Sequence, residues 1–181
     1  RTRAKAEPLA DVATVADDPQ TAVAQADAIV TMVDNSPIVT EIYFGGNGIA
    51  ERAPKGALFI DMSSIQPAVA RDHAQMLSQS GHRHLDAPVS GGEKGAIEAT
   101  LAIMAGGDVG DFADAEKLLS SMGRATHVGT HGAGQVAKLA NQAIVAVTIG
   151  AIAEASLLAQ EGGCDPAALR DALMGGFATS R

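Results

Sequence analysis

The sequence predicts an α/β protein in which a parallel sheet with crossover helices is followed by the start of an all-helical domain. Three observations predict this class. Short apolar runs alternate with amphipathic stretches in the first part of the chain, which is the rhythm of strands and helices in a parallel sheet. That rhythm stops after residue 128, where a glycine-rich turn leads into a long apolar stretch without proline. Alanine and glycine are abundant, which favours close packing of helices on a sheet.

Five short apolar runs bounded by turn residues are expected to form the strands. They cover residues 28–33, 58–62, 84–87, 101–105 and 125–128. Helix-length segments separate most of them, so we expect parallel pairing with helices on both faces of the sheet.

Helix starts are indicated by a capping residue followed by proline, as at Asp18-Pro19 and Gln66-Pro67. The expected helices cover residues 18–26, 66–80, 108–122, 135–161 and 165–175. The fourth has about 27 residues and a length of roughly 40 Å. Its apolar residues occupy several faces, which predicts burial against more than one partner. We therefore expect an α/β domain at residues 1–129 and a helical domain at residues 130–181.

Composition excludes several function classes. The chain has a net charge of −8, 3% aromatic residues and no tryptophan, which argues against a nucleic-acid partner and against an anionic membrane surface. No apolar run is long enough to suggest a membrane span. A single cysteine permits no intramolecular disulfide, which suits a reducing compartment, so we expect a cytoplasmic protein.

The segment at residues 86–92, DAPVSGG, leaves a predicted strand at its carboxyl end, where open α/β sheets bind ligands. The two successive glycines Gly91 and Gly92 expose backbone N–H groups. Together with the Ser90 hydroxyl, these groups have the chemistry to hold a carboxylate. A plain strand-ending turn is the alternative interpretation of the same residues.

Lys138 and Asn141 lie three residues apart near the start of the long helix and share one of its faces. A lysine on a helix is usually a solvated charge. Here the same face carries Gly134 and Val145, so a lysine that faces a pocket is a credible interpretation. An ammonium beside a developing alkoxide acts as a general acid, and burial lowers its pKa toward the working range.

No metal site is expected. His82 and His84 alternate on a predicted strand, but no third ligand lies near them in the sequence. The loops at residues 31–37 and 60–64 each follow a strand at its carboxyl end, although neither is specific when taken alone.

Together, and in this order, these stretches resemble the β-hydroxyacid dehydrogenase family, which includes 3-hydroxyisobutyrate dehydrogenase and tartronate semialdehyde reductase. Residues 86–107 (DAPVSGGEKGAIEATLAIMAGG) resemble the substrate-binding signature of the family. Residues 132–142 (GAGQVAKLANQ) resemble its catalytic-lysine signature. The motifs NSPIVTEI, GNGI and IDMSSI match the tartronate semialdehyde reductase branch.

The resemblance implies a partial Rossmann-type parallel sheet domain and an NAD(P)-dependent oxidoreductase that acts on a small 3-hydroxy acid or semialdehyde. Lys138 would exchange the proton with the substrate oxygen, and Asn141 would orient both the lysine and the substrate. Ser90, Gly91 and Gly92 would hold the substrate carboxylate. A homo-oligomer assembled through the helical domain is also implied.

The cofactor contacts implied by the resemblance are Met32, Val33 and Ser63 along the cofactor, with Arg1 and Thr2 beside the adenosine ribose. Arg1 would favour a 2′-phosphate, so NADP is slightly favoured over NAD. The family usually has Leu-Pro where this chain has Val33-Asp34, which leaves the side-chain contacts there open.

The chain departs from the family in having no G-x-G-x-x-G fingerprint, so we expect it to be part of a longer protein, without the N-terminal glycine-loop unit. Two other functions fit the same fold. One is an imine reductase of the same superfamily, and the other is a non-catalytic nucleotide-binding module. Both typically lack the lysine, so Lys138 argues against them.

Overall fold

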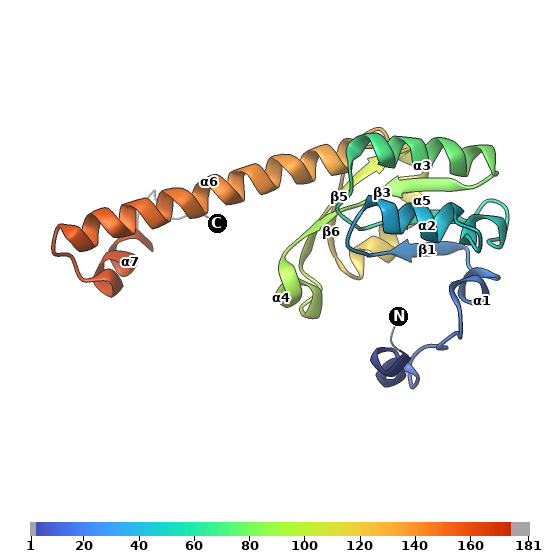
Figure 1. The fold of residues 1–181 in the computed structure, drawn as a ribbon, viewed down its shortest axis with the longest axis horizontal. Helices are drawn as coiled ribbons and strands as arrows, with labels where there is room; N and C mark the ends of the chain where they lie inside the picture. Colours follow the sequence, from blue (N-terminus) through green and yellow to red (C-terminus); the bar gives the residue numbers. More distant parts are fainter. Residues whose placement is uncertain (1–2, 175–181) are drawn as a thin grey trace. The chain divides into compact units, whose positions relative to one another are not determined.

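A computed structural model of the chain describes residues 3–174. The chain forms two compact units, Arg1–Lys138 and Leu139–Arg181, so the division falls within the long helix α6 (Ala133–Glu161) (Figure 1). The expected domain boundary between residues 129 and 130 stays a prediction.

Strands and helices alternate in the first unit (Figure 1). The strands are β1 (Ala28–Thr31), β2 (Leu58–Asp61), β3 (Arg83–Asp86), β4 (Val89–Ser90), β5 (Leu101–Gly107) and β6 (Gly123–Gly129). The helices are α1 (Pro19–Val23), α2 (Ser36–Phe44), α3 (Pro67–Gln79), α4 (Gly92–Ile97) and α5 (Val109–Ser120), with 3-10 turns at Arg3–Lys5, Glu7–Leu9 and Ile49–Glu51. The five predicted strands are present with shifted ends, whereas α2, α4 and β4 were not predicted.

Helices α1 and α2 begin in the same way. The Asp18 carboxylate accepts the N–H of Thr21, and the Asn35 side-chain oxygen accepts the N–H of Ile38 at 3.1 Å. In each helix a proline follows the capping residue within the first turn, where its missing N–H costs nothing. The start of α2 was therefore marked in the sequence by the signal that predicted α1.

The strands form one sheet in the order β1-β2-β3-β5-β4, with β6 paired to β5. The first three strands are parallel, as expected. Strand β5 runs antiparallel to both β3 and β4, and β6 runs parallel to β5, so the sheet is mixed. The reason is the connection: only the six-residue helix α4 and its short turns join β4 to β5, and parallel pairing requires a longer crossover.

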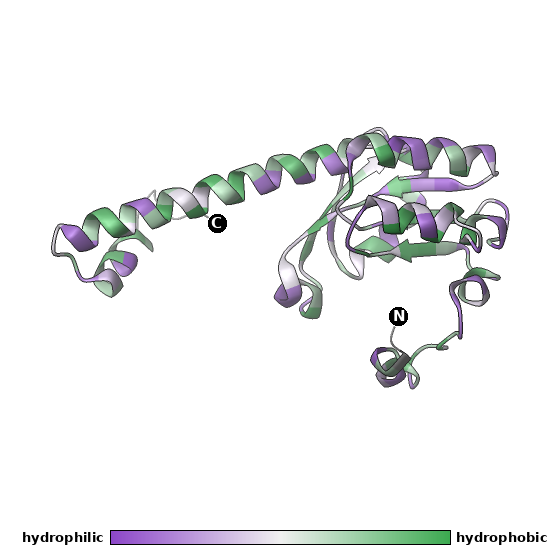
Figure 2. Ribbon diagram, viewed as in Figure 1, coloured by the Kyte–Doolittle hydropathy of each residue, from purple (hydrophilic) through white to green (hydrophobic). Residues whose placement is uncertain are grey.

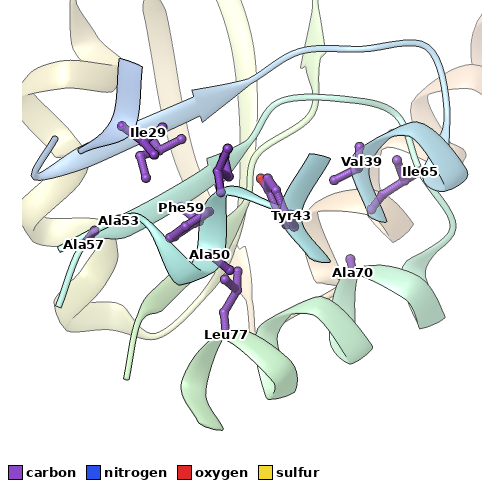
Figure 3. Packing of buried hydrophobic residues seen from close by; sticks show 12 residues of the cluster. Ile29, Val39, Tyr43, Ala50, Ala53, Ala57, Phe59, Ile65, Ala70 and Leu77 are labelled. Atoms are coloured by element: carbon purple, nitrogen blue, oxygen red, sulfur yellow. The ribbon is translucent and has the colours of Figure 1, made fainter. Parts of the chain in front are cut away.

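Helices cover both faces of the sheet at β2. Figure 3 shows Phe59 of β2 packed between Tyr43 of α2 and Leu77 of α3 on one face. On the other face, Leu58 and Ile60 belong to a second cluster that includes Ala115 and Leu119 of α5. Burial on both faces explains why β2 is continuously apolar at Leu58, Phe59 and Ile60 instead of alternating.

Helix α6 has 29 residues and is followed by α7 (Pro166–Met174). Within α6, Gly134 and Gln135 are buried, whereas apolar side chains farther along the helix, such as Ile144 and Val147, are exposed. Figure 2 shows apolar segments along much of α6, interrupted by hydrophilic residues. The expected burial on several faces is therefore not found within residues 3–174, because in the described part of the second unit α7 is the only other helix.

By length and composition alone, α6 is long and apolar enough to cross a membrane, and the expectation that no apolar stretch reaches that length was wrong. The finding is weak support for a membrane span, because a helix that other protein helices cover has the same composition.

Gly134 allows the start of α6 to lie directly against the sheet. A Cβ added there would overlap the carbonyl oxygens of Met104 and Asp86. Gly134→Ala should therefore lower the free energy of unfolding of the full-length protein by about 1–3 kcal/mol, as overpacking usually does. Denaturant unfolding measures the change.

The matched control is Gly150→Ala in the same helix, where an added Cβ meets nothing within 4 Å. This substitution should be neutral or stabilise the helix by up to about 1 kcal/mol, the difference in helix propensity. Equal effects of the two substitutions would contradict the close approach at Gly134.

Candidate active site

The carboxyl ends of β1, β2 and β3 lie side by side at one edge of the sheet. Their register pairs Thr31 with Asp61 and Asp61 with Asp86, the last residues of the three strands. Ligands of open α/β sheets bind at this edge. The loops after β1 and β2 carry Met32, Val33 and Ser63, three of the cofactor residues expected from the sequence.

Ser63 joins the loops that follow β1 and β2. Its hydroxyl accepts the N–H of Val33 at 2.9 Å, and its own N–H donates to Asp61 Oδ1 at 2.9 Å. Ser63 is buried, whereas the Met32 side chain is 64% exposed. Among the expected cofactor contacts, Ser63 therefore fixes the loop conformation, and Met32 presents an apolar surface. Arg1 and Thr2 lie outside the described residues.

The buried carboxylate of Asp86 holds the start of α6. Its Oδ1 accepts the N–H of Gly132 at 2.7 Å, and its Oδ2 accepts the N–H of Gln135 at 3.0 Å. A carboxylate at this position satisfies amides that have no partner within the helix and interacts favourably with the helix dipole. Burial raises the pKa of Asp86, and the two amide bonds oppose that rise.

Gln135 connects the same turn of α6 to the loop after β2. Its Oε1 accepts the N–H of Ile65 at 3.0 Å, and its Nε2 donates to the carbonyl of Ser63 at 2.9 Å. The residue is 1% exposed. Both polar atoms of the side chain are thus bound to the backbone of the loop that carries Ser63.

Lys138 lies three residues after Gln135 and is half-buried. Burial lowers the pKa of Lys138 below its ordinary value of 10.5, which is the direction that acid–base chemistry near neutral pH requires. Asn141 follows in the same helix but belongs to the second unit, and its Nδ2 donates to Gln142 Oε1 at 3.1 Å.

Ser90 ends β4, where it pairs with Ala102 of β5. The next two residues, Gly91 and Gly92, have φ angles of +140° and +61°, which favour glycine. A Cβ at Gly91 would press on Leu101 at 3.1 Å, whereas a Cβ at Gly92 would meet nothing within 4 Å. A side chain at Gly91 would therefore displace Leu101 slightly, whereas a Cβ at Gly92 would point into open space.

Among residues 3–174, no three His, Cys, Asp or Glu side chains are grouped so as to hold a metal ion. His82 Nε2 donates to the carbonyl of Ala50 at 2.8 Å. His84 is buried, and burial lowers its pKa to about 3, so it is a neutral core residue.

Asp61 is the buried group whose hydrogen bonding is least complete at this edge. Its Oδ2 is buried and has no hydrogen-bond partner among the described residues. Burial raises the pKa of Asp61 from 3.8 to about 6; the hydrogen bonds from Ser63 oppose the rise and the nearby charge of Asp86 adds to it.

The structure brings three segments together: the end of β3 at Asp86, the loop that carries Ser63, and the first turn of α6 that leads to Lys138. The sequence identified Ser63 and Lys138 but assigned no role to Asp61, Asp86 or Gln135. The available signal was a carboxylate at the end of a strand, together with the Gly-x-Gly start of a helix. Their contact across 46 residues appears only in the fold.

These features define a Rossmann-type dinucleotide-binding sheet followed by a helix that carries a half-buried lysine. Residues 1–153 match the family described as the NAD binding domain of 6-phosphogluconate dehydrogenase. Residues 132–181 match the description NAD-binding of NADP-dependent 3-hydroxyisobutyrate dehydrogenase. The chain belongs to the first of these families, whose domains bind NAD or NADP. The resemblance inferred from the two sequence signatures is therefore confirmed.

The relatives agree with this assignment. The 2-hydroxy-3-oxopropionate reductase of Escherichia coli (strain K12) is 48% identical over 156 residues, which are 86% of this chain and 53% of the relative. The solved Mycobacterium tuberculosis 3-hydroxyisobutyrate dehydrogenase with L-serine is 38% identical with a TM-score of 0.83, over 91% of this chain and 56% of that one.

An imine reductase variant from Myxococcus stipitatus in complex with NAD+ has a TM-score of 0.84 over 96% of this chain and 61% of that one. At 22% identity, this likeness shows the fold alone. The chain spans about half the length of the curated relatives that it matches.

Asp61 gives a pH-dependent prediction. The fold raises the pKa of Asp61 from 3.8 to about 6, so the folded state binds this proton more tightly than the unfolded state does. The stability that proton binding gives the folded state is therefore lost as the pH rises from about 4 to about 6. Asp61→Asn keeps an acceptor for Ser63 and removes the charge. Relative to wild type, its free energy of unfolding should therefore rise by up to about 3 kcal/mol across the window.

Urea unfolding of the full-length protein at a series of pH values measures this difference. Asp72→Asn, at an exposed position on α3, is the control and should show no such trend. A difference between Asp61→Asn and wild type that is independent of pH would mean that the Asp61 carboxyl is not desolvated by the fold.

Proposed function

We propose that the chain belongs to an enzyme that transfers a hydride between NAD(P) and a small 3-hydroxy acid or its semialdehyde. The observation that carries the proposal is Lys138, whose pKa burial lowers and whose helix is bonded to the loop of Ser63 at the ligand-binding edge of the sheet. Of the two family branches, we favour 2-hydroxy-3-oxopropionate reductase, the activity of a relative that is 48% identical.

Lys138 would give a proton to the substrate oxygen in reduction and take it back in oxidation, with Asn141 orienting the lysine and the substrate. Ser90 and the amides of Gly91 and Gly92 would hold the substrate carboxylate, for which the open backbone at Gly92 leaves room. The hydroxyl of Ser90 and the two successive backbone N–H groups are hydrogen-bond donors that suit a carboxylate.

The residues at the ends of β1 and β2 fit a dinucleotide, because Met32 offers an exposed apolar side chain beside a loop that Ser63 holds in place. Met32, Val33 and Ser63 would hold the cofactor, which when bound supplies or accepts the hydride. We propose NADP over NAD, since Arg1 has the charge for a 2′-phosphate and residues 132–181 match an NADP-dependent family.

We also propose a homo-oligomer formed through the helical domain, because apolar side chains of α6 such as Ile144, Val147 and Ile149 are exposed in this chain. Light scattering of the full-length protein tests this proposal. A cytoplasmic location is consistent with the single cysteine of the chain, Cys164, which permits no disulfide within these 181 residues.

The decisive experiment is an assay of the full-length protein with NADPH and NADH against tartronate semialdehyde, methylmalonate semialdehyde and a cyclic imine. Reduction of a semialdehyde supports the proposal. Reduction of the imine alone would favour the imine reductase whose fold the chain shares. Binding of the cofactor without any turnover would favour a non-catalytic module.

Lys138→Met removes the proposed proton donor while keeping a side chain of similar length. It should lower kcat by at least about 10²-fold, the usual scale for general acid–base catalysis. Cofactor affinity, measured by fluorescence titration, should be retained. Lys117→Met on the exposed face of α5 is the matched control, and a Lys138→Met enzyme as fast as this control would refute the assignment.

Ser90→Ala removes one donor from the proposed carboxylate site. It should raise KM for the acid by the equivalent of about 1–3 kcal/mol, the cost of a lost bond to a charged group. Gly92→Ala should raise KM further, because its Cβ meets no atom of the chain and would lie where the ligand approaches. Ser120→Ala is the control, and an amide analogue that reacts as well as the carboxylate would contradict this site.

A further inference from the structure

We propose that Gln135 is a positioning residue that sets the placement of Lys138 against the loop carrying Ser63. The inference rests on the proposed function, in which Lys138 moves the proton. It assigns a specific task to a side chain that touches neither the substrate nor the cofactor in that scheme.

The side chain of Gln135 accepts one hydrogen bond and donates another, both with backbone groups. The buried side chain accepts a hydrogen bond from the N–H of Ile65 at 3.0 Å and donates one to the carbonyl of Ser63 at 2.9 Å. These two partners lie 70 and 72 residues earlier in the chain. A side-chain amide carries both an acceptor and a donor at one end, so it satisfies this pair of backbone groups, which a residue with only one of these functions cannot do.

Asp86 by itself does not fix the first turn of α6. Its carboxylate binds the N–H groups of Gly132 and Gln135, and both lie at the very start of the helix. A helix held only at its end can still pivot about that end. The side chain of Gln135 adds a second attachment, to a different loop, and thereby restricts both the tilt and the rotation of this turn.

Fixing Gln135 also fixes the position of Lys138, because the two residues are three apart, which is less than one turn of an α-helix. The loop that Gln135 holds is also the loop whose Ser63 hydroxyl accepts the N–H of Val33. One continuous set of hydrogen bonds therefore runs from the lysine-bearing turn to both proposed cofactor loops. Errors of about 1 Å in the placement of reacting groups reduce rates by up to about 10²-fold.

The first test is Gln135→Met in the full-length protein. Methionine is similar in length but makes neither hydrogen bond. We expect kcat to fall by about 10- to 100-fold while the Kd for NADPH changes by less than about threefold. Gln79→Met, at the exposed end of α3, makes the same chemical change outside the site and is the matched control.

The second test separates positioning from a loss of structure. A protonated carboxylic acid has one O–H donor and one carbonyl acceptor, so protonated Gln135→Glu reproduces both bonds, whereas its ionised form repels the Ser63 carbonyl. The ratio of the kcat of Gln135→Glu to that of wild type should therefore rise as the pH falls, by up to about tenfold per pH unit where the carboxylate predominates. The same ratio for Gln135→Met should not rise.

The outcomes distinguish this inference from the proposed function. A wild-type enzyme that reduces no semialdehyde overturns both. With an active wild type, the inference alone is overturned by a Gln135→Met kcat within about threefold of the Gln79→Met control, or by a loss that matches the unfolded fraction measured by circular dichroism. A loss of kcat in the folded variant, with acid-dependent recovery in Gln135→Glu, supports it.

Discussion

The rest of the site depends on the buried carboxylate of Asp86 at the end of β3. A buried charge without partners is strongly unfavourable, and so are unpaired amides at a buried helix start. The contacts of Asp86 with the N–H groups of Gly132 and Gln135 resolve both problems with one group. They also require a close approach of backbone to backbone, which the missing side chains of Gly106 and Gly134 permit.

This constraint explains why a single helix has two different environments. Its first turns belong to the unit that contains the sheet, where Gly134 and Gln135 are buried and Lys138 is half-buried. The lowered pKa of Lys138 is a consequence of that burial and therefore of the anchor that creates it. Proton chemistry at Lys138 and the stability of the junction between α6 and the sheet thus depend on the same hydrogen bonds.

Local signals in the sequence predicted most of the helices and strands. The features that sequence reasoning missed depend on contacts between segments far apart in the chain. Asp18 and Pro19 marked α1, and the apolar run at residues 58–62 marked β2. Pairing direction is a property of two segments, so nothing local indicated that β5 runs antiparallel to β3. Local motifs and the resemblance indicated Lys138 and Ser90 as candidate site residues, but the partners of Gln135 lie about 70 residues away and become visible only when the chain is folded.

The composition of α6 does not by itself determine the surroundings of the helix, because a membrane span and a helix covered by other protein helices have similar apolar residues. Between Lys138 and Glu154 the helix has 15 residues without a charge, so a membrane span of roughly 20 residues in α6 would include at least one charged residue. A charged side chain within a membrane span is unfavourable, and most of all near the centre of the bilayer. At a contact between protein helices, Lys138 can face the site and Glu154 can lie at the rim, where water remains. The spacing of charges along α6 therefore favours a cover made of protein.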